Sequence, residues 1–180
     1  MLITPYTDSW VEKFQSIRLA LDTSLQGIDY TIEHVGSTSI DGLDAKAIID
    51  IDIIYEQATE FEQIKAGLIS IGYYHNGDQG IPQREVFKRT GTQHSGVLDN
   101  TPHHLYVCLA GSPGLNRHLL FRDHLRKNDE ARLTYQAMKY ELAARANQDK
   151  KRYAELKELH INDFVDSVIE AEKQLNSKTR

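Results

Sequence analysis

The chain has 180 residues, of which 40% are apolar and 26% charged, and its formal net charge is −5 at pH 7. This length suits a single globular domain, and the negative charge argues against general nucleic-acid binding. No apolar run approaches the roughly 20 residues of a membrane-spanning helix. The single cysteine, Cys108, excludes an internal disulfide and is typical of a reducing compartment. The first residues lack the basic and apolar segments of a signal peptide, so we expect a cytoplasmic protein without a membrane part.

The apolar spacing of the first 110 residues predicts alternating helices and strands. Steps of three and four residues favour helices, and β-branched runs favour strands. In chain order we expect a helix at 8–25 capped by Asp8, strands at 30–35 and 48–55, a helix at 58–71, and strands at 85–89 and 104–110. The connection at 36–44 is expected to be a turn with a short helix near 39–43, and 73–82 is expected to be a loop. The polar segment between the strands at 85–89 and 104–110, which holds Gly91, Gly96 and Pro102, is expected to be a loop that forms a hairpin or flap.

The character of the sequence changes after Gly114, because no proline or glycine follows it. The charged, periodic remainder predicts three helices at about 115–127, 129–147 and 149–174. We therefore expect one domain over residues 1–180, in which 1–110 form an α/β core and 111–180 form a helical segment. These helices are expected to pack on the sheet rather than to form a separate domain.

Two aspartates, Asp50 and Asp52, interrupt a run of isoleucines in the strand predicted at 48–55. Because strand side chains alternate between faces, both carboxylates should share one face, about 6–7 Å apart. Aspartate is depleted from strands and costly to bury without a compensating charge. Mg²⁺ prefers carboxylates, phosphate oxygens and water as ligands, and two such ions can assist one phosphoryl displacement. The pair is therefore a candidate site for one or two Mg²⁺ ions, and a solvated strand face that happens to carry two aspartates is the alternative.

A Gly-Ser turn, Gly36 and Ser37, follows the preceding predicted strand. Glycine permits close backbone approach, and consecutive N–H groups at 36–39 can form an anion-binding nest. A plain turn rich in small residues is the alternative. Lys46 precedes Asp50 by four residues; it can approach a phosphate as a point charge or remain a solvated surface residue.

The order of strand, Gly-Ser turn, short helix and Asp-x-Asp strand resembles the nucleotidyltransferase superfamily typified by DNA polymerase beta. More narrowly, the sequence is similar to the GrpB family, because further matching segments cover nearly the whole chain. These are Pro5-Tyr6 with Trp10 and Phe14, the run 33–39, Gly42-Leu43, Ala45-Lys46, His104-Leu105, the run 117–123 with Leu125-Arg126, and Tyr153 with Lys157. The resemblance implies an α+β fold, namely a nucleotidyltransferase-like mixed sheet flanked by helices, with the helical C-terminal third packed on it.

For the site, the resemblance implies that Gly36 and Ser37 hold the triphosphate of an NTP. Asp50 and Asp52 would then hold metal. A third acidic residue usually comes from a neighbouring strand, and here that strand offers His104 and Tyr106 where the family pattern has His-x-His. His104 is accordingly a candidate metal ligand or general base, with a structural histidine as the alternative.

Other residues are weaker candidates for the site. The acids that could replace the missing carboxylate are Glu85 and Asp99, and the basic residues that could contact phosphate or substrate are Arg84, Lys88 and Arg117. Tyr153 and Lys157, one turn apart on the last predicted helix, are expected either to face the site or to pack. Arg122 and Asp123 are expected to form an ion pair between a helix and the sheet. Of the histidines at 34, 75, 94, 118, 124 and 160, only His34 is expected near the site, and their spacing does not indicate zinc.

The main hypothesis is a Mg²⁺-dependent nucleotidyltransferase that moves a nucleoside monophosphate from an NTP to an unidentified acceptor. Asp50 and Asp52 bind metal, Lys46 and Arg84 neutralise phosphate charge, and His104 completes the site. The second hypothesis is a non-catalytic module that binds a nucleotide or phosphate, which the missing third carboxylate favours. The third is a protein-interaction role for the helical C-terminal third.

Overall fold

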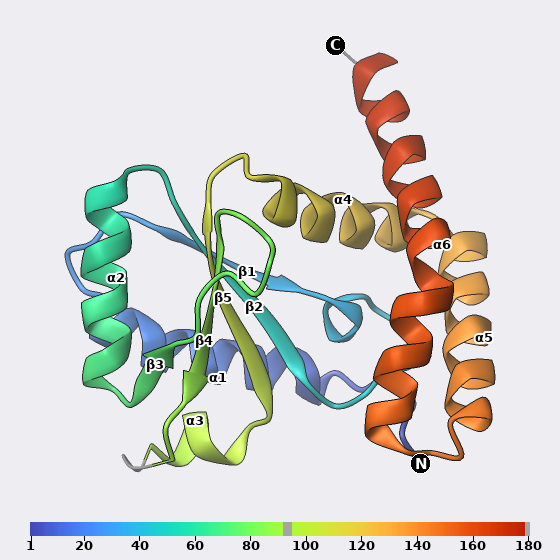
Figure 1. The fold of residues 1–180 in the computed structure, drawn as a ribbon, viewed down its shortest axis with the longest axis horizontal. Coiled ribbons are helices and arrows are strands. Elements are labelled where there is room, and N and C mark those ends of the chain that lie inside the picture. Colours follow the sequence, from blue (N-terminus) through green and yellow to red (C-terminus); the bar gives the residue numbers. More distant parts are fainter. Residues whose placement is uncertain (92–94, 179–180) are drawn as a thin grey trace.

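The computed structural model describes residues 1–91 and 95–178 and contains one mixed five-stranded sheet with helices on both faces (Figure 1). The strand order is β1-β2-β5-β4-β3. Only β2 and β5 pair in parallel, and the other neighbours are antiparallel. The strands are β1 (Thr31–Val35), β2 (Ile49–Tyr55), β3 (Tyr73–His75), β4 (Arg84–Arg89) and β5 (His103–Leu109). This arrangement confirms the predicted α+β class.

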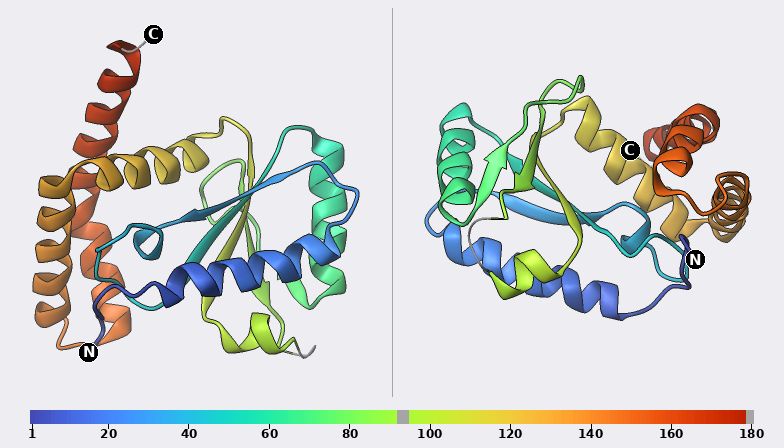
Figure 2. Two further views of the ribbon diagram at one scale, coloured as in Figure 1. Left: turned by 180° about the vertical axis from the view of Figure 1, so that it is seen from behind. Right: turned by 60° about the horizontal axis from the view of Figure 1, so that its bottom comes forward.

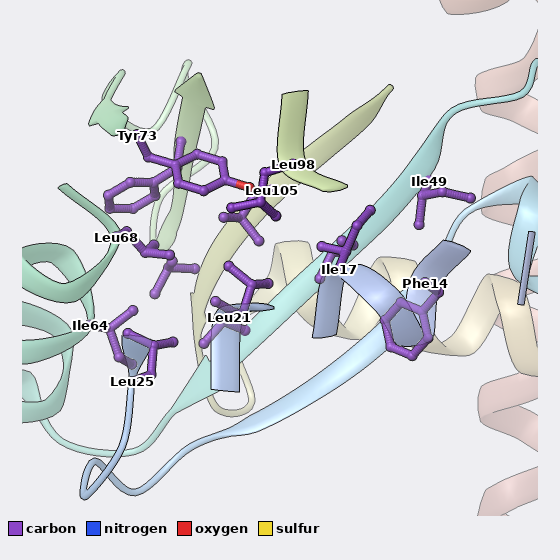
Figure 3. Close-up of a cluster of buried hydrophobic side chains, with 14 of the residues drawn as sticks. Phe14, Ile17, Leu21, Leu25, Ile49, Ile64, Leu68, Tyr73, Leu98 and Leu105 are labelled. Atoms are coloured by element: carbon purple, nitrogen blue, oxygen red, sulfur yellow. The ribbon is translucent and has the colours of Figure 1, made fainter. Parts of the chain in front are cut away.

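Two helices cover one face of the sheet, and their apolar stripes build the main hydrophobic core. They are α1 (Ser9–Ser24) and α2 (Ala58–Ser70). Three alternate isoleucines of β2, Ile49, Ile51 and Ile53, point to this face and are completely or almost completely buried. Figure 3 shows Ile49 in this core, near Phe14 and Ile17 of α1. Each such burial stabilises the fold by about 1.5–3 kcal/mol. The same alternation places Asp50 and Asp52 on the opposite face.

The C-terminal helices follow the prediction closely. They are α4 (Pro113–Lys127), α5 (Asp129–Arg145) and α6 (Lys150–Lys178). Helix α4 packs against β1 and β5, and α5 and α6 pack against α4 at one end of the sheet (Figure 2). A second apolar cluster joins these helices to the N-terminal segment and to the connection before β2. Its buried members include Leu2, Ile3, Ile40, Leu43, Leu125, Leu142, Tyr153 and Ile161.

Three local predictions were wrong, each where an element is short. The expected loop at 73–82 contains β3, whose Tyr73 is buried in the main core and pairs with Arg89. The expected polar loop before Pro102 contains α3 (Gly96–Asn100), anchored by buried Leu98. The short helix expected near 39–43 is a single 3-10 turn, η1 (Ser37–Ser39). Each of these three elements has only three to five residues, and none of them carries a periodic apolar pattern that separates it from the loops around it.

Candidate functional site

The two aspartates of β2 lie beside polar residues of β5, because the two strands pair in parallel. Asp50 is opposite His104, and Asp52 is opposite Tyr106. The Nδ1 atom of His104 lies 2.8 Å from Oδ1 of Asp50. The predicted neighbourhood of Asp50 and His104 is therefore present, and this contact holds the Asp50 carboxylate beside β5.

Asp52 has no exposed surface, and its partner comes from α4 rather than from the sheet. The Nδ1 atom of His118 lies 2.8 Å from Oδ2 of Asp52. Within the described residues Oδ1 of Asp52 is buried and has no hydrogen-bond partner. The expectation that only His34, among the remaining histidines, would lie near the site was wrong, because His118 of α4 contacts Asp52 and borders the cavity described below. His94 lies outside the described residues.

Gly36 occupies a position that no other residue can take without a shift of its surroundings. Its backbone angles, φ 69° and ψ −173°, fall in a region that is essentially restricted to glycine. A Cβ atom here would lie 2.1 Å from Oδ2 of Asp50. The hydroxyl of Ser39 donates to the carbonyl of Gly36 at 2.7 Å, and Thr38 donates to the carbonyl of Ile48 at 3.1 Å. These bonds hold the Gly-Ser turn to the residue that precedes β2, and the Asp50 carboxylate lies directly against the backbone of Gly36.

These residues border a cavity of about 490 Å³ between the open face of the sheet and helices α4, α5 and α6. The sheet side contributes Gly36, Ser37, Asp50, His104 and Tyr106. The helical side and the segment before β2 contribute, among others, Lys46, Arg117, His118, Tyr135, Lys139, Tyr153 and Lys157. Asp52 is not among the described lining residues, but it contacts His118, which is one of them. The cavity therefore brings the Asp50 carboxylate and the Gly-Ser turn together with a group of basic side chains.

Burial and neighbouring groups shift the pKa values of the lysines of this cavity. Lys139 is 2% exposed, donates to the carbonyl of Asp44 and lies over the ring of Tyr135. Burial, together with the charge of Lys157, lowers the pKa of Lys139 to about 7. The Lys46 ammonium lies 4.2 Å from the centroid of the Tyr153 ring, and burial lowers its pKa as well. The interaction with Tyr135 raises the pKa of Lys157, so this lysine stays charged.

Arg84, predicted to contact the nucleotide, lies elsewhere. Its guanidinium group stacks on the Tyr106 ring at 4.8 Å from the centroid, and it lines a second cavity beyond that ring. It is not among the described residues that border the cavity of Gly36 and Asp50. Arg117 does border that cavity, where it donates to Asp166 and, at 3.3 Å, to Asn162.

Neither acid suggested as a third carboxylate reaches the aspartate pair. Glu85 is opposite Val107, which places it on the α1 and α2 side of the sheet, and it lies 2.5 Å from Nε2 of His75. Asp99 pairs with Arg89. Among the described residues that border the cavity, the carboxylates are Asp50 and Glu158. Both suggestions were wrong, because Glu85 contacts His75 on the opposite face of the sheet and Asp99 pairs with Arg89.

Several nearby residues have structural roles. The ring of buried His34 stacks on Phe14 at 4.7 Å between centroids, and burial lowers its pKa to about 4. Arg122 donates to Asp123 at 2.8 Å, as predicted, but it is Glu33 of β1, at 2.6 Å from Arg122, that links the helix to the sheet. Burial raises the pKa of Cys108, so its thiol is a poor nucleophile at neutral pH.

The aspartate pair fits a hard divalent cation better than it fits a structural zinc. Oδ1 of Asp52 has no hydrogen-bond partner among the described residues, and Oδ2 of Asp50 lies close to the backbone of Gly36. Across residues 1–91 and 95–178 there is no cluster of three or more His, Cys, Asp or Glu side chains placed to hold a metal. Two carboxylates suit Mg²⁺, which takes its remaining ligands from phosphate and water.

Among residues 1–91 and 95–178 no helix has the length and apolar character that a membrane crossing requires.

Sequence comparison identifies relatives along most of the chain. The family model described as GrpB protein matches residues 1–168. The chain is 32% identical to the UPF0157 protein YqkA of Bacillus subtilis and covers 38% of it; it is 35% identical to the UPF0157 protein PA4798 of Pseudomonas aeruginosa and covers 60% of it. These matches span 77% and 84% of this chain. A dephospho-CoA kinase of Mycolicibacterium paratuberculosis is 27% identical over 89% of the chain, which covers 44% of that protein. The chain thus spans less than two thirds of each of these relatives.

Structure comparison gives a consistent result. GrpB from Enterococcus faecalis has a TM-score of 0.75 and 28% identity, over 94% of this chain and 98% of that one. The Cid1 poly(U) polymerase in its MgGTP-bound structure has a TM-score of 0.56 and 16% identity, over 81% of this chain and 45% of that one. The second likeness shows a shared fold only. The chain therefore belongs to the GrpB family, and its fold is similar to that of the nucleotidyltransferases.

Proposed function

We propose that this protein is a Mg²⁺-dependent nucleotidyltransferase that moves a nucleoside monophosphate from an NTP to an acceptor hydroxyl. The observation that carries the proposal is the cavity that joins Gly36, Ser37 and Asp50 to Lys46 and Lys157. A triphosphate is the kind of ligand that suits a glycine turn, a metal-binding carboxylate and lysine ammonium groups together.

In this proposal Gly36 and Ser37 hold the β- and γ-phosphates through backbone and hydroxyl groups, and Lys46 and Lys157 neutralise their charge. Asp50 and the unpartnered oxygen of Asp52 would hold Mg²⁺. A bound Mg²⁺ would neutralise phosphate charge and polarise the α-phosphoryl group. The likeness in fold to Cid1, whose structure holds MgGTP, supports a nucleotide as the ligand but leaves the preferred base open.

The transfer itself follows from in-line displacement. The acceptor oxygen forms a bond to the α-phosphorus, the bond from that phosphorus to the bridging oxygen breaks, and pyrophosphate leaves with the bonding electrons. The hydroxyl proton passes to Nε2 of His104, the ring nitrogen not engaged with Asp50. In this role His104 replaces the carboxylate that β5 lacks.

Thermal unfolding with Mg²⁺ and each NTP tests the binding step, because a ligand of the folded state raises the melting temperature by mass action. We expect a rise that is abolished in the double variant Asp50→Asn/Asp52→Asn. The matched control is Asp29→Asn/Asp163→Asn, which changes two exposed aspartates and should keep the rise. If no nucleotide raises the melting temperature, or if the Asp50/Asp52 variant responds like the native chain, the proposed site is wrong.

A non-catalytic nucleotide-binding module is the second candidate, favoured by the absence of a third carboxylate at Tyr106 of β5. Incubation with NTP labelled at the α-phosphate, across a broad set of hydroxyl acceptors, separates the two. Label found in an acceptor, together with released pyrophosphate, establishes transfer and refutes the module. Nucleotide binding without label transfer in any acceptor would favour the module.

A further inference from the structure

A second cavity, of about 690 Å³, opens where β4 and β5 separate. The register of these strands runs from Arg84 opposite Cys108 to Phe87 opposite Leu105. Beyond it, Lys88 and Arg89 pair with β3 on their other side. The ends of β4 and β5 therefore diverge and form part of the cavity lining, which includes Lys88, Arg89, Thr101, Pro102, His103 and His104.

This second cavity adjoins the proposed nucleotide cavity through shared residues. His104 and Tyr106 border both of them. The ring of Tyr106 is close to both Arg84, at 4.8 Å from its centroid, and His118, whose ring centroid is 5.5 Å away. A molecule in the second cavity therefore reaches the histidine that contacts Asp50, while its other end can lie beside Arg84.

The lining of the second cavity is largely apolar or neutral, but its charged residues are mostly basic. Arg84, Lys88 and Arg89 border it, and the carboxylate among its described lining residues is Asp99, which pairs with Arg89 at 2.7 Å. This leaves the charges of Arg84 and Lys88 to act on a ligand. Within the described residues Nε of Arg84 is buried and without a hydrogen-bond partner. A buried donor left in this state is destabilising, and an anion that approaches the guanidinium group would relieve part of that cost.

We propose that this cavity is the acceptor site and that the acceptor is a small anionic molecule with a hydroxyl group. Its phosphate or carboxylate group pairs with Arg84 and Lys88, since arginine binds both groups in a bidentate manner, and its hydroxyl group lies at His104. The identification as an acceptor site rests on the proposed function. The cavity volume suits a small molecule, and the net charge of −5 disfavours an extended nucleic acid.

Nuclear magnetic resonance of the full ¹⁵N-labelled chain tests the anion site without any nucleotide. Inorganic phosphate and, in a parallel sample, acetate are titrated while the Arg84 Nε–H signal and the Lys88 and His104 amides are followed. We expect saturable shifts of these three signals, and the tighter-binding anion identifies the acidic group. The control Arg18→Gln removes an exposed arginine on α1 and should leave the titration unchanged.

Two variants make the test decisive. Arg84→Gln should weaken the anion at least about tenfold, as expected for loss of a charged hydrogen-bond donor. Lys88→Gln, at an exposed position, should weaken it severalfold and provides the answer if Arg84→Gln does not fold. The proposal is overturned if no saturable shift occurs at these signals, or if neither variant changes the titration.

The acceptor role has its own readout. For any acceptor labelled in the transfer assay, Lys88→Gln should raise the KM for that acceptor and leave kcat unchanged; an unchanged KM would overturn the acceptor site. The proposed nucleotide site is judged separately, from shifts of the Gly36 and Ser37 amides when Mg²⁺ and NTP are added. An absence of anion binding at Arg84 can therefore be distinguished from an absence of nucleotide binding at Gly36.

Discussion

Nδ1 of His118 lies 2.8 Å from Oδ2 of Asp52, and this contact joins α4 to the central strand of the site. This contact uses one oxygen of the buried Asp52 carboxylate, and the other oxygen, Oδ1, has no hydrogen-bond partner among the described residues. An ionised carboxylate in such a position is stable only when it is paired. The contact therefore couples the folding of the C-terminal helices to the electrostatics of the site.

Replacement of His118 should destabilise the fold through Asp52. His118→Leu leaves the carboxylate buried with neither oxygen bonded, and we expect the free energy of unfolding in urea to fall by about 3–5 kcal/mol. The double variant His118→Leu/Asp52→Asn also removes the unpaired carboxylate charge, so it should recover a large part of that loss of stability. Strictly additive effects in this double-mutant cycle would contradict the coupling. His160→Leu, at an exposed histidine of α6, is the control and should change little.

Substitution of Gly36 should damage the site more than its backbone strain explains. In Gly36→Ala the new Cβ meets the Asp50 carboxylate at 2.1 Å, so Asp50 must move, and the backbone angles add about 1–3 kcal/mol. Gly27→Ala is the matched control, because Gly27 also has a positive φ, +79°, but a Cβ added there would meet no atom within 4 Å. We expect both variants to lose stability in urea, and only Gly36→Ala to lose the melting-temperature rise with Mg²⁺ and NTP. Equal binding by both variants would contradict the role of the Gly36–Asp50 contact.

Local patterns were sufficient to predict the sheet face of the site. The alternation of β2 places Asp50 and Asp52 on one face, and the same alternation in β5 places His104 and Tyr106 beside them once the two strands pair. The structure added the information that β2 and β5 are neighbours and pair in parallel. The Gly-Ser turn could be placed for a similar reason, since it immediately follows β1 and leads to β2.

The helical side of the site could not be predicted from spacing alone. His118 and Asp52 are 66 positions apart, and their contact depends on how α4 crosses the sheet. One signal was available, because His118, Arg122 and Leu125 follow the helical steps of four and three that mark one face, and Arg122 and Leu125 are buried. The position of Arg84 depends on strand order: it shares the face of Tyr106 but lies one strand further from Asp50.

Lys139 should take up protons when a nucleotide binds. Its pKa in the free chain is about 7, below the ordinary 10.5, so at pH 8 it is mostly neutral. A phosphate group in the cavity favours the charged form and raises this pKa, so binding should draw up to about one proton from solution. Calorimetric titration in two buffers of different ionisation enthalpy measures this uptake. Lys139→Met should reduce it, with Lys46→Met measuring the contribution of the other lysine whose pKa burial lowers. Undiminished uptake in Lys139→Met would contradict the assignment.

His34 should make the fold less stable in mild acid. Burial lowers its pKa from 6.5 to about 4, so between these pH values the unfolded chain binds a proton that the folded chain does not. The free energy of unfolding must then fall as the pH falls from about 6.5 towards 4, by up to about 3 kcal/mol at 1.36 kcal/mol per unit of pKa shift. Urea unfolding of the native chain at pH 7, 5.5 and 4.5 measures the fall.

The carboxylates also titrate in this range, so the contribution of His34 must be taken as a difference between variants. His34→Gln keeps a polar partner for Thr38, which lies 3.0 Å from Nε2 of His34, but it cannot gain a proton. Its stability should therefore decline less steeply between pH 6.5 and 4.5 than that of the native chain. His160→Gln, at an exposed histidine, should keep the native slope. If His34→Gln and the native chain lose stability in parallel over this range, His34 is not held neutral in the fold.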